Sequence, residues 1–238
     1  MAKSNYQRIL LKLSGESLTD AGEFGLNGRV LKDLAETIAK VAKAGTEVAI
    51  VVGGGNIWRY SESHDAEIER STSDTMGMLA TVMNGIALQN AIEQAGTFCR
   101  VQTALTMPQV AEPFIRRRAI RHMEKGRVVI FVAGAGSPYF TTDTAAALRA
   151  LEINADVLLK GTKVDGVYDR DPHNDQTAKK YDRISYSDVL AKRLGFMDAT
   201  AISLCRENEL PIIVFNILDR AALDRVVRGE RVGTEVHP

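Results

Sequence analysis

The residues that could do chemistry gather around one strand-like apolar run, residues 128–132, and the turn that follows it. The run has the length and the β-branched composition of a parallel strand that is covered on both faces. Gly134 and Gly136 then allow the chain to turn, and Thr141 or Thr142 can cap a helix. Unpaired N–H groups at the start of that helix, together with its dipole, favour an anion such as a phosphate.

This turn could also have a purely structural role, because every strand-to-helix connection needs a turn and a cap. The dinucleotide fingerprint G-x-G-x-x-G is not matched, since Tyr139 occupies the place of its third glycine. Asp143 adds a carboxylate in the first helical turn, where the dipole favours it. A carboxylate would repel a phosphate unless a metal ion or lysines lie between them, so the rest of the chain should supply cations.

Cations and further glycines stand at the ends of other apolar runs. Lys12 interrupts one such run, and Lys160 ends another. A lysine in a strand can also protect a sheet edge from aggregation, and this alternative stays open for Lys12. Three glycines at 53–55 follow a third run and let the backbone approach a ligand closely, and Arg59 just beyond could bind a phosphate with two hydrogen bonds.

Strand and helix patterns alternate along the whole chain, which predicts a three-layer αβα sandwich with a mainly parallel central sheet. Strands are predicted at 8–14, 47–52, 98–102, 128–132, 155–160, 212–215 and near 232–236. Helices are predicted at 28–44, 71–95, 114–125, 142–151, 186–194, 198–208 and 220–227. The carboxyl ends of parallel strands share one edge, where the glycine turns, Lys12, Asp143 and Lys160 should meet.

Two other segments carry candidate functional residues. The predicted helix 71–95 has an apolar surface too wide for one core, and its small residues and methionines suggest close packing against a helix of another subunit. Asp74 in this helix is either a capping or solvated carboxylate or a ligand for ribose hydroxyls. Tyr168, in the long polar connection 161–172, could stack on a base.

The composition excludes several classes of protein. Thirty basic residues balance thirty acidic ones, which argues against a nucleic-acid-coating or membrane-surface role, and the arginines at 116–118 are expected on a solvated face or a subunit contact. The sequence has neither a targeting segment nor an apolar window of about eighteen residues, so we expect a cytoplasmic protein. Cys99 and Cys205 form no C-x-x-C pair and are expected to be buried thiols in a reducing compartment.

Two lysines, an aspartate, glycine turns and a helix start suit phosphoryl transfer, which depends mainly on positioning and charge neutralisation. The chain contains neither G-x-x-x-x-G-K-[ST] nor the H-R-D and D-F-G signatures, so P-loop and protein-kinase designs are excluded at the level of motifs. The four histidines form no H-x-x-x-H pair, which argues against a zinc hydrolase.

From about residue 8 to residue 233 the sequence resembles the bacterial uridylate (UMP) kinases of the amino acid kinase superfamily. The resemblance is carried by KLSGES, GGGNIWR, DTMGMLATVMN, SPYFTTDTAA and LKGTKVDGVYDRDP. It implies the amino acid kinase fold in one domain, 1–238, with an acceptor-side lobe at about 1–150 and an ATP-side lobe at about 151–238. It also implies transfer of the γ-phosphoryl of ATP to UMP in pyrimidine nucleotide biosynthesis, in a homohexamer activated by GTP and inhibited by UTP. Mg²⁺ would arrive with ATP, since no motif for direct metal binding is present.

The resemblance also implies roles for individual residues. The catalytic residues would be Lys12, Asp143 and Lys160. The ATP site would comprise Lys12, Leu13, Ser14, Gly15, Gly55, Arg59, Thr162, Tyr168 and Asp171. The UMP site would comprise Gly54, Asp74, Ala135, Gly136, Ser137, Pro138, Tyr139, Phe140, Thr141 and Thr142. A loop linked to GTP activation would comprise Asp20, Ala21, Gly22, Glu23, Phe24 and Gly25.

Several positions depart from the family pattern, and other activities stay open. Ala135 and Ser137 replace a common threonine and asparagine of the uracil site, and Tyr60 replaces a common glycine. The effector response is also in question, because unexpected residues occupy three positions: Gln89, Glu93 and Arg116. Relatives in the superfamily phosphorylate carbamate, acetylglutamate or aspartate. The fold resemblance also reaches metal-oxoanion storage proteins, and UMP kinases can double as regulatory partners in pyrimidine control. The acceptor-side motifs favour UMP among these alternatives.

Overall fold

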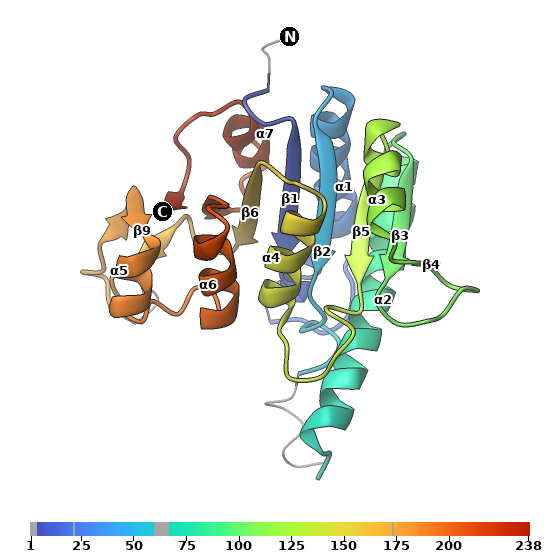
Figure 1. The fold of residues 1–238 in the computed structure, drawn as a ribbon, viewed down its shortest axis with the longest axis horizontal. Helices are drawn as coiled ribbons and strands as arrows, with labels where there is room; N and C mark the ends of the chain where they lie inside the picture. Colours follow the sequence, from blue (N-terminus) through green and yellow to red (C-terminus); the bar gives the residue numbers. More distant parts are fainter. Residues whose placement is uncertain (1–3, 21, 60–66, 173) are drawn as a thin grey trace.

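The computed structural model describes residues 4–20, 22–59, 67–172 and 174–238. Two residues discussed above, Ala21 and Tyr60, lie outside this part of the chain. Within it, a mainly parallel sheet is flanked by helices on both faces, which confirms the predicted three-layer αβα sandwich (Figure 1).

The central sheet of the described chain has nine strands in the order β4-β3-β5-β2-β1-β6-β10-β11-β9. Their bounds are β1 Arg8–Leu13, β2 Glu47–Val52, β3 Cys99–Thr103, β4 Glu112–Pro113, β5 Val128–Val132, β6 Val157–Thr162, β9 Arg183–Ser185, β10 Ile212–Asn216 and β11 Thr234–His237. Only the β10–β11 pair among them is antiparallel. A separate antiparallel hairpin joins β7 (Val167–Tyr168) to β8 (Lys180–Tyr181).

The helices divide between the two faces of the sheet. Their bounds are η1 Gly15–Leu18, α1 Gly28–Lys43, α2 Arg70–Gln94, α3 Arg116–Glu124, α4 Thr142–Glu152, α5 Tyr186–Ala191, α6 Ala199–Glu207 and α7 Ala222–Val227. Side chains of α1, α2 and α7 form one apolar cluster, and those of α3 to α6 form the other. In Figure 1, α4 and α6 lie in front of the sheet, with α1 and α7 behind it.

Strand alternation decides which face each lysine occupies. Ile9, Leu11 and Leu13 belong to the cluster of α1, whereas Leu10 belongs to that of α4, so Lys12 shares the α4 face. Leu158 of β6 likewise belongs to the α4 side, which places Lys160 on that face too. Because β1 lies in the middle of the sheet, the alternative that Lys12 protects a sheet edge is wrong.

Several predicted boundaries differ from the observed ones for local reasons. Strand β6 continues past Lys160 to Thr162 because its pairing with β10 extends to that residue. Helix α3 begins at Arg116, later than the predicted residue 114, since the backbone N–H of Phe114 donates to the carbonyl of Thr103 in β3 at 2.9 Å. Helix α5 ends at Ala191, and Arg193 then adopts φ of 51°.

Two further features of the described chain concern its cysteines and the length of its helices. Both cysteines are buried and free, as expected, and burial raises the pKa of each thiol to about 12. No helix in the described part of the chain is long and apolar enough to span a membrane.

Candidate active site

The register of the sheet places Lys12 and Lys160 side by side. Lys12 of β1 pairs directly with Lys160 of β6 in the parallel ladder, and the two side chains share the α4 face. They are only 8% and 7% exposed. Two buried ammonium groups this close repel each other and require an anion between them.

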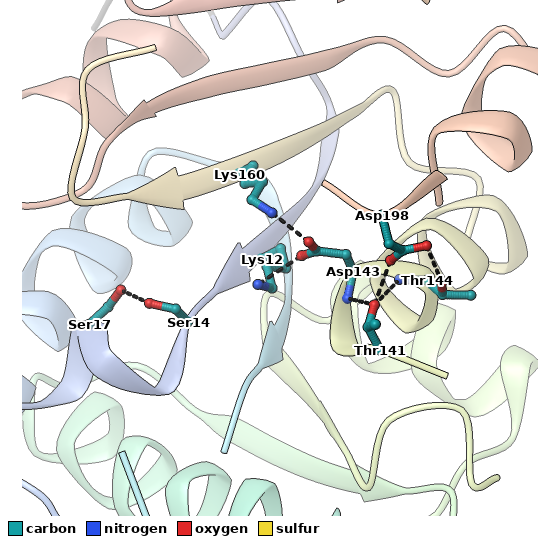
Figure 2. Close-up of polar contacts among 8 residues, drawn as sticks. All are labelled: Lys12, Ser14, Ser17, Thr141, Asp143, Thr144, Lys160 and Asp198. Carbon is teal, nitrogen blue, oxygen red and sulfur yellow. Dashed lines mark hydrogen bonds and ion pairs between the residues drawn. The ribbon is translucent and has the colours of Figure 1, made fainter. Parts of the chain in front are cut away.

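Asp143 of α4 is that anion. Its Oδ1 lies 2.8 Å from Lys12 Nζ, and its Oδ2 accepts a hydrogen bond of 2.5 Å from Lys160 Nζ (Figure 2). The contact to Lys12 is an ion pair without the alignment of a hydrogen bond, so Oδ1 accepts no well-aligned hydrogen bond. The three residues predicted as catalytic therefore form one buried cluster.

Electrostatics within the cluster follow from burial and mutual charge. Burial alone would raise the pKa of the Asp143 carboxyl, but the charges of Lys12 and Lys160 outweigh it and hold the pKa below its ordinary value. Burial lowers the pKa of Lys160 to about 8, and repulsion from Lys12 adds to this shift while Asp143 opposes it. The charge of Lys160 is therefore sensitive to pH near neutrality.

The start of α4 is capped as the sequence predicts. Thr141, one of the two predicted caps, accepts hydrogen bonds from the N–H groups of Asp143 at 3.1 Å and Thr144 at 3.2 Å. Its hydroxyl donates to Asp198 Oδ2 at 2.5 Å, and the hydroxyl of Thr144 donates to Oδ1 of the same residue at 2.9 Å. Asp198, which also caps α6, thus ties the two helices together at the site.

The glycines of the two turns are required by close backbone approach. A Cβ on Gly15 would lie 2.7 Å from the backbone nitrogen of Gly55. A Cβ on Gly54 would lie 2.8 Å from the carbonyl oxygen of Gly77 in α2. Gly136 adopts φ of 79° and has similarly little space beside Ala104. These contacts draw the end of β1 against the end of β2, the end of β2 against α2, and the end of β5 against the end of β3.

A cavity of about 150 Å³ lies between the two glycine turns and the start of α2. Six residues of the predicted UMP site line it: Gly54, Asp74, Ala135, Ser137, Phe140 and Thr142. Within the described chain, four other predicted residues stand outside that lining: Gly136, Pro138, Tyr139 and Thr141. The lining also includes residues that the sequence reasoning did not assign to UMP: Gly55, Trp58, Ser73, Gly77, Met78, Thr81 and Gly134.

Asp74 is held by one partner from another segment and by one from the first turn of its own helix. Its Oδ2 accepts a hydrogen bond of 2.8 Å from the backbone N–H of Tyr139, which adopts φ of 72°. Its carboxylate also accepts from Arg70 Nε at 2.9 Å. Helix α2 begins at Arg70 with Glu69 at the cap position, so the alternative that Asp74 caps the helix is wrong.

Arg59 lies against the glycine turn and contacts an acidic residue. Its Nε donates to the carbonyl oxygen of Gly55 at 2.8 Å, and its Nη2 pairs with Glu16 of η1. The other oxygen of Glu16 lies 3.5 Å from Lys163 Nζ. Arg59, the residue predicted to bind a phosphate, thus lies at the carboxyl ends of the strands, as the lysines do, and the carboxylate of Glu16 lies beside it.

The residues predicted to bind ATP lie between the carboxyl ends of the central strands and the β7–β8 hairpin. Ser14 Oγ lies 2.9 Å from Ser17 Oγ at the start of η1, and Thr162 Oγ1 donates to the carbonyl of Val164 at 2.7 Å. Tyr168 and Asp171 line a groove of about 400 Å³ together with residues 192–196. The structure therefore places these two residues in one groove, apart from the lysine cluster.

The loop predicted to respond to GTP is described except for Ala21. Its backbone is tied to the glycine turn, because the N–H of Gly25 donates to the carbonyl of Asn56 at 2.7 Å. Asp20 accepts a hydrogen bond of 2.6 Å from Asn27 Nδ2, and Phe24 is 78% exposed. The remaining predicted residues, Gly22 and Glu23, connect these two anchored points.

A larger cavity of about 670 Å³ lies at the opposite edge of the sheet, between α1 and α7. Ser4 and Thr46, which precede β1 and β2, line it. None of the predicted site residues contributes to its lining in the described chain, so size alone does not identify the functional site.

Comparison with known protein families identifies one that matches most of the chain. A model described as "Amino acid kinase family" matches residues 7–216. The chain belongs to the amino acid kinase family. The matched residues include the lysine cluster, both glycine turns and the loop that carries Tyr168 and Asp171.

Three solved structures resemble the chain. The UMP kinase of Bacillus anthracis is 38% identical, with a TM-score of 0.95 over 98% of this chain and 96% of its own. The UMP kinase of Ureaplasma parvum is 39% identical, with a TM-score of 0.92 over 98% and 99%. The uridylate kinase of Archaeoglobus fulgidus is 28% identical, with a TM-score of 0.74 over 96% and 99%.

Sequence reasoning missed two residues that support this amino acid kinase site, Asp198 and Trp58. Asp198 lies more than fifty positions from the threonines it holds, so no local pattern could reveal it. Trp58 donates through Nε1 to Ser73 Oγ at 2.9 Å and lines the cavity. The GGGNIWR motif was the available signal for Trp58, because it places this residue three positions after Gly55.

Proposed function

We propose that this chain is a UMP kinase, which transfers the γ-phosphoryl group of ATP to UMP and releases UDP and ADP. The observation that carries the proposal is the buried cluster of Lys12, Asp143 and Lys160 beside a cavity lined by Gly54 and Asp74. The choice of UMP as acceptor is supported by the two UMP kinases that are 38% and 39% identical to the chain.

The chemistry needs positioning and charge neutralisation more than covalent help from the protein. A phosphate oxygen of UMP forms the new bond to the γ-phosphorus, and the bond from that phosphorus to the β,γ-bridging oxygen breaks. The acceptor phosphate is already an anion, so no general base is required. Lys12 and Lys160 stabilise the negative charge on the transferring group, while Asp143 holds the two ammonium groups in place.

Mg²⁺ fits this site as an ion carried by ATP. Among the described residues, no group of three or more potential ligands could hold a metal by itself. Asp143 supplies the carboxylate of the cluster, and both of its oxygens already face ammonium groups, at 2.8 Å from Lys12 Nζ and 2.5 Å from Lys160 Nζ. Mg²⁺ commonly binds one or two carboxylates together with substrate phosphates, and it would neutralise phosphate charge. Asp143 would be the residue that faces it.

The acceptor and the donor occupy different halves of the site in this proposal. UMP lies in the cavity between the glycine turns, with Asp74 on the ribose hydroxyls and Arg59 and Thr142 near the phosphate. The remaining residues of the stretch 135–141 surround the uracil and the ribose. The acceptor-side lobe is about 1–150, and the ATP-side lobe is about 151–238.

In this proposal ATP extends from the carboxyl ends of the central strands to the groove beside the β7–β8 hairpin. Its phosphates lie along residues 12–15, Gly55 and Arg59, and Thr162 holds the start of the loop beyond β6. Its base lies in the groove that Tyr168 and Asp171 line.

We also propose the cellular context that the family resemblance implies. The protein acts in pyrimidine nucleotide biosynthesis in the cytoplasm as a homohexamer, with GTP as activator and UTP as inhibitor. Leu79, Met83 and Ile86 on α2 are 47%, 55% and 41% exposed, which supports a contact between subunits there. The loop at 20–25 is the candidate GTP-responsive element.

The test is ADP release by the purified chain with MgATP and one acceptor at a time. The acceptors are UMP, CMP, dUMP, carbamate, acetylglutamate and aspartate, and the product is identified for each positive reaction. Turnover with UMP is the expected result. Turnover with only carbamate or an amino acid would keep the ATP site and refute the assignment of Asp74 and of residues 135–142. No turnover in folded protein that binds ATP would favour a binding or regulatory role.

A further inference from the structure

Two asparagines form a buried amide pair behind the glycine turn that follows β2. Asn84, in the middle of α2, is 0% exposed, and Asn56, at the end of the turn, is 3% exposed. Asn84 Nδ2 donates to Asn56 Oδ1 at 2.7 Å, and Asn56 Nδ2 donates back to Asn84 Oδ1 at 3.1 Å. A reciprocal pair of this kind fixes both the distance and the rotation of one side chain relative to the other.

The remaining amide hydrogens of the pair bind backbone on either side. Asn84 Nδ2 also donates to the carbonyl of Gly53 at 2.7 Å, and Asn56 Nδ2 also donates to the carbonyl of Gly25 at 2.7 Å. All four amide hydrogens are therefore used. Helix α2, the glycine turn and the loop that ends at Gly25 are held in one network, and buried networks in which every group is paired are rigid.

The same helix supports the second glycine turn one helical turn earlier. Thr81 Oγ1 accepts a hydrogen bond of 2.7 Å from the backbone N–H of Ala133, which adopts φ of 61°. Gly77, one turn earlier again, has its carbonyl oxygen against Gly54. One face of α2 thus contacts both walls of the cavity in which we place UMP.

We infer that Asn84 is a positioning residue that sets the glycine turn 53–56 in register with α2. Its role in nucleotide binding rests on the function proposed above, whereas its role in holding the turn does not. The turn bears Gly54 and Gly55, which face the proposed acceptor and donor, so a shift of the turn alters both nucleotide sites. Displacement of reacting groups by about 1 Å can reduce the rate about 100-fold.

The chain offers a matched pair of substitutions for a test. Asn84→Asp preserves shape but replaces both donated hydrogen bonds with an oxygen that repels Gly53 O and Asn56 Oδ1. Asn90→Asp makes the same chemical change on an exposed position of the same helix. Asn84→Ser keeps one hydroxyl donor and serves as a milder variant if Asn84→Asp does not fold.

Trp58 provides a readout that needs no substrate. It is the single tryptophan of the chain, and its backbone N–H donates to the carbonyl of Gly54 at 3.0 Å, so it follows the position of the turn. We expect Asn84→Asp to shift the emission maximum of Trp58 and to increase its quenching by acrylamide, whereas Asn90→Asp leaves both unchanged. With MgATP and UMP, we expect kcat/KM to fall about 10- to 100-fold for Asn84→Asp alone, at a temperature where the variant remains folded.

A purely structural asparagine gives a different result. Trp58 emission, quenching and both KM values would then match those of the unsubstituted protein, while only the midpoint of urea unfolding would fall. That result, in Asn84→Asp or in Asn84→Ser, overturns the inference. Because the Trp58 measurement is independent of turnover, absence of UMP kinase activity in the unsubstituted chain would refute the proposed function without deciding the role of Asn84.

Discussion

Replacing Asp143 by asparagine should destabilise the protein strongly at neutral pH. Its carboxylate lies 2.8 Å from Lys12 Nζ and 2.5 Å from Lys160 Nζ, and the two lysines are 8% and 7% exposed. The neutral amide would leave two buried ammonium groups without a counter-charge. Removing one partner of a buried ion pair typically costs about 3–5 kcal/mol, and we expect a loss of this size in the free energy of unfolding.

The loss should depend on pH because Lys160 titrates. In the unsubstituted protein its pKa is lowered from 10.5 to about 8. The unfolded chain therefore binds more protons between these values, and this group makes stability rise with pH across that window. Without Asp143 the pKa of Lys160 falls further, so the rise begins at lower pH. The stability difference should therefore narrow as the pH rises toward about 8, and it should stay constant above that value, where Lys160 is neutral in both folded proteins.

Urea unfolding at pH 7 and at pH 9, followed by circular dichroism, measures both effects. Asp182→Asn is a suitable control because Asp182 is exposed, and we expect it to leave the unfolding free energy nearly unchanged at both values. A variant at Asp143 that matches the unsubstituted protein in stability at pH 7 would refute the argument that the buried charges depend on this carboxylate. A loss of the same size at both pH values would refute the assignment of the titration to Lys160.

Three further predictions concern the site and its support. The kcat/KM for ATP should fall above about pH 8 as Lys160 loses its proton, and a flat profile from pH 7 to 9.5 in steady-state assays would contradict this. Asp74→Asn should raise the KM for UMP more than that for ATP, and equal changes in both would argue against a ribose contact. Gly54→Ala should cost about 1–3 kcal/mol in urea unfolding, because its Cβ would lie 2.8 Å from the carbonyl oxygen of Gly77. Gly28→Ala is the control, since a Cβ there meets nothing within 4 Å, and an equal cost in both variants would refute the steric argument.

Much of the fold could be predicted from local sequence patterns. Long apolar runs and helical periods identified the central strands and the main helices, because these elements are buried over most of their length. The short pairings were missed, since β4, β7 and β8 have two residues each and β9 has three, and all four depend on partners elsewhere in the chain. Thr141 was among the expected caps because a cap acts within one helical turn.

The convergence of Lys12, Asp143 and Lys160 could be predicted because parallel strands end at one edge of the sheet. The residues that hold the site in place could not be predicted. Asp198 and Asn84 act through contacts with residues far away in the sequence, and although Asn84 ends the DTMGMLATVMN motif, the motif does not reveal these partners. The contact between Asp74 and the backbone of Tyr139 could not be predicted either. It depends on the positive φ of Tyr139, 72°, and a positive φ can be expected from the sequence mainly at glycine.

The most direct test of the account is formation of UDP from MgATP and UMP, followed by ³¹P nuclear magnetic resonance. The unsubstituted chain should form one UDP for each ADP. A folded variant with both Lys12→Ala and Lys160→Ala should be slower by at least about 100-fold, since two groups that stabilise the transferring phosphoryl are removed. Absence of UDP with the folded unsubstituted chain, or unchanged turnover in the double variant, would contradict the account.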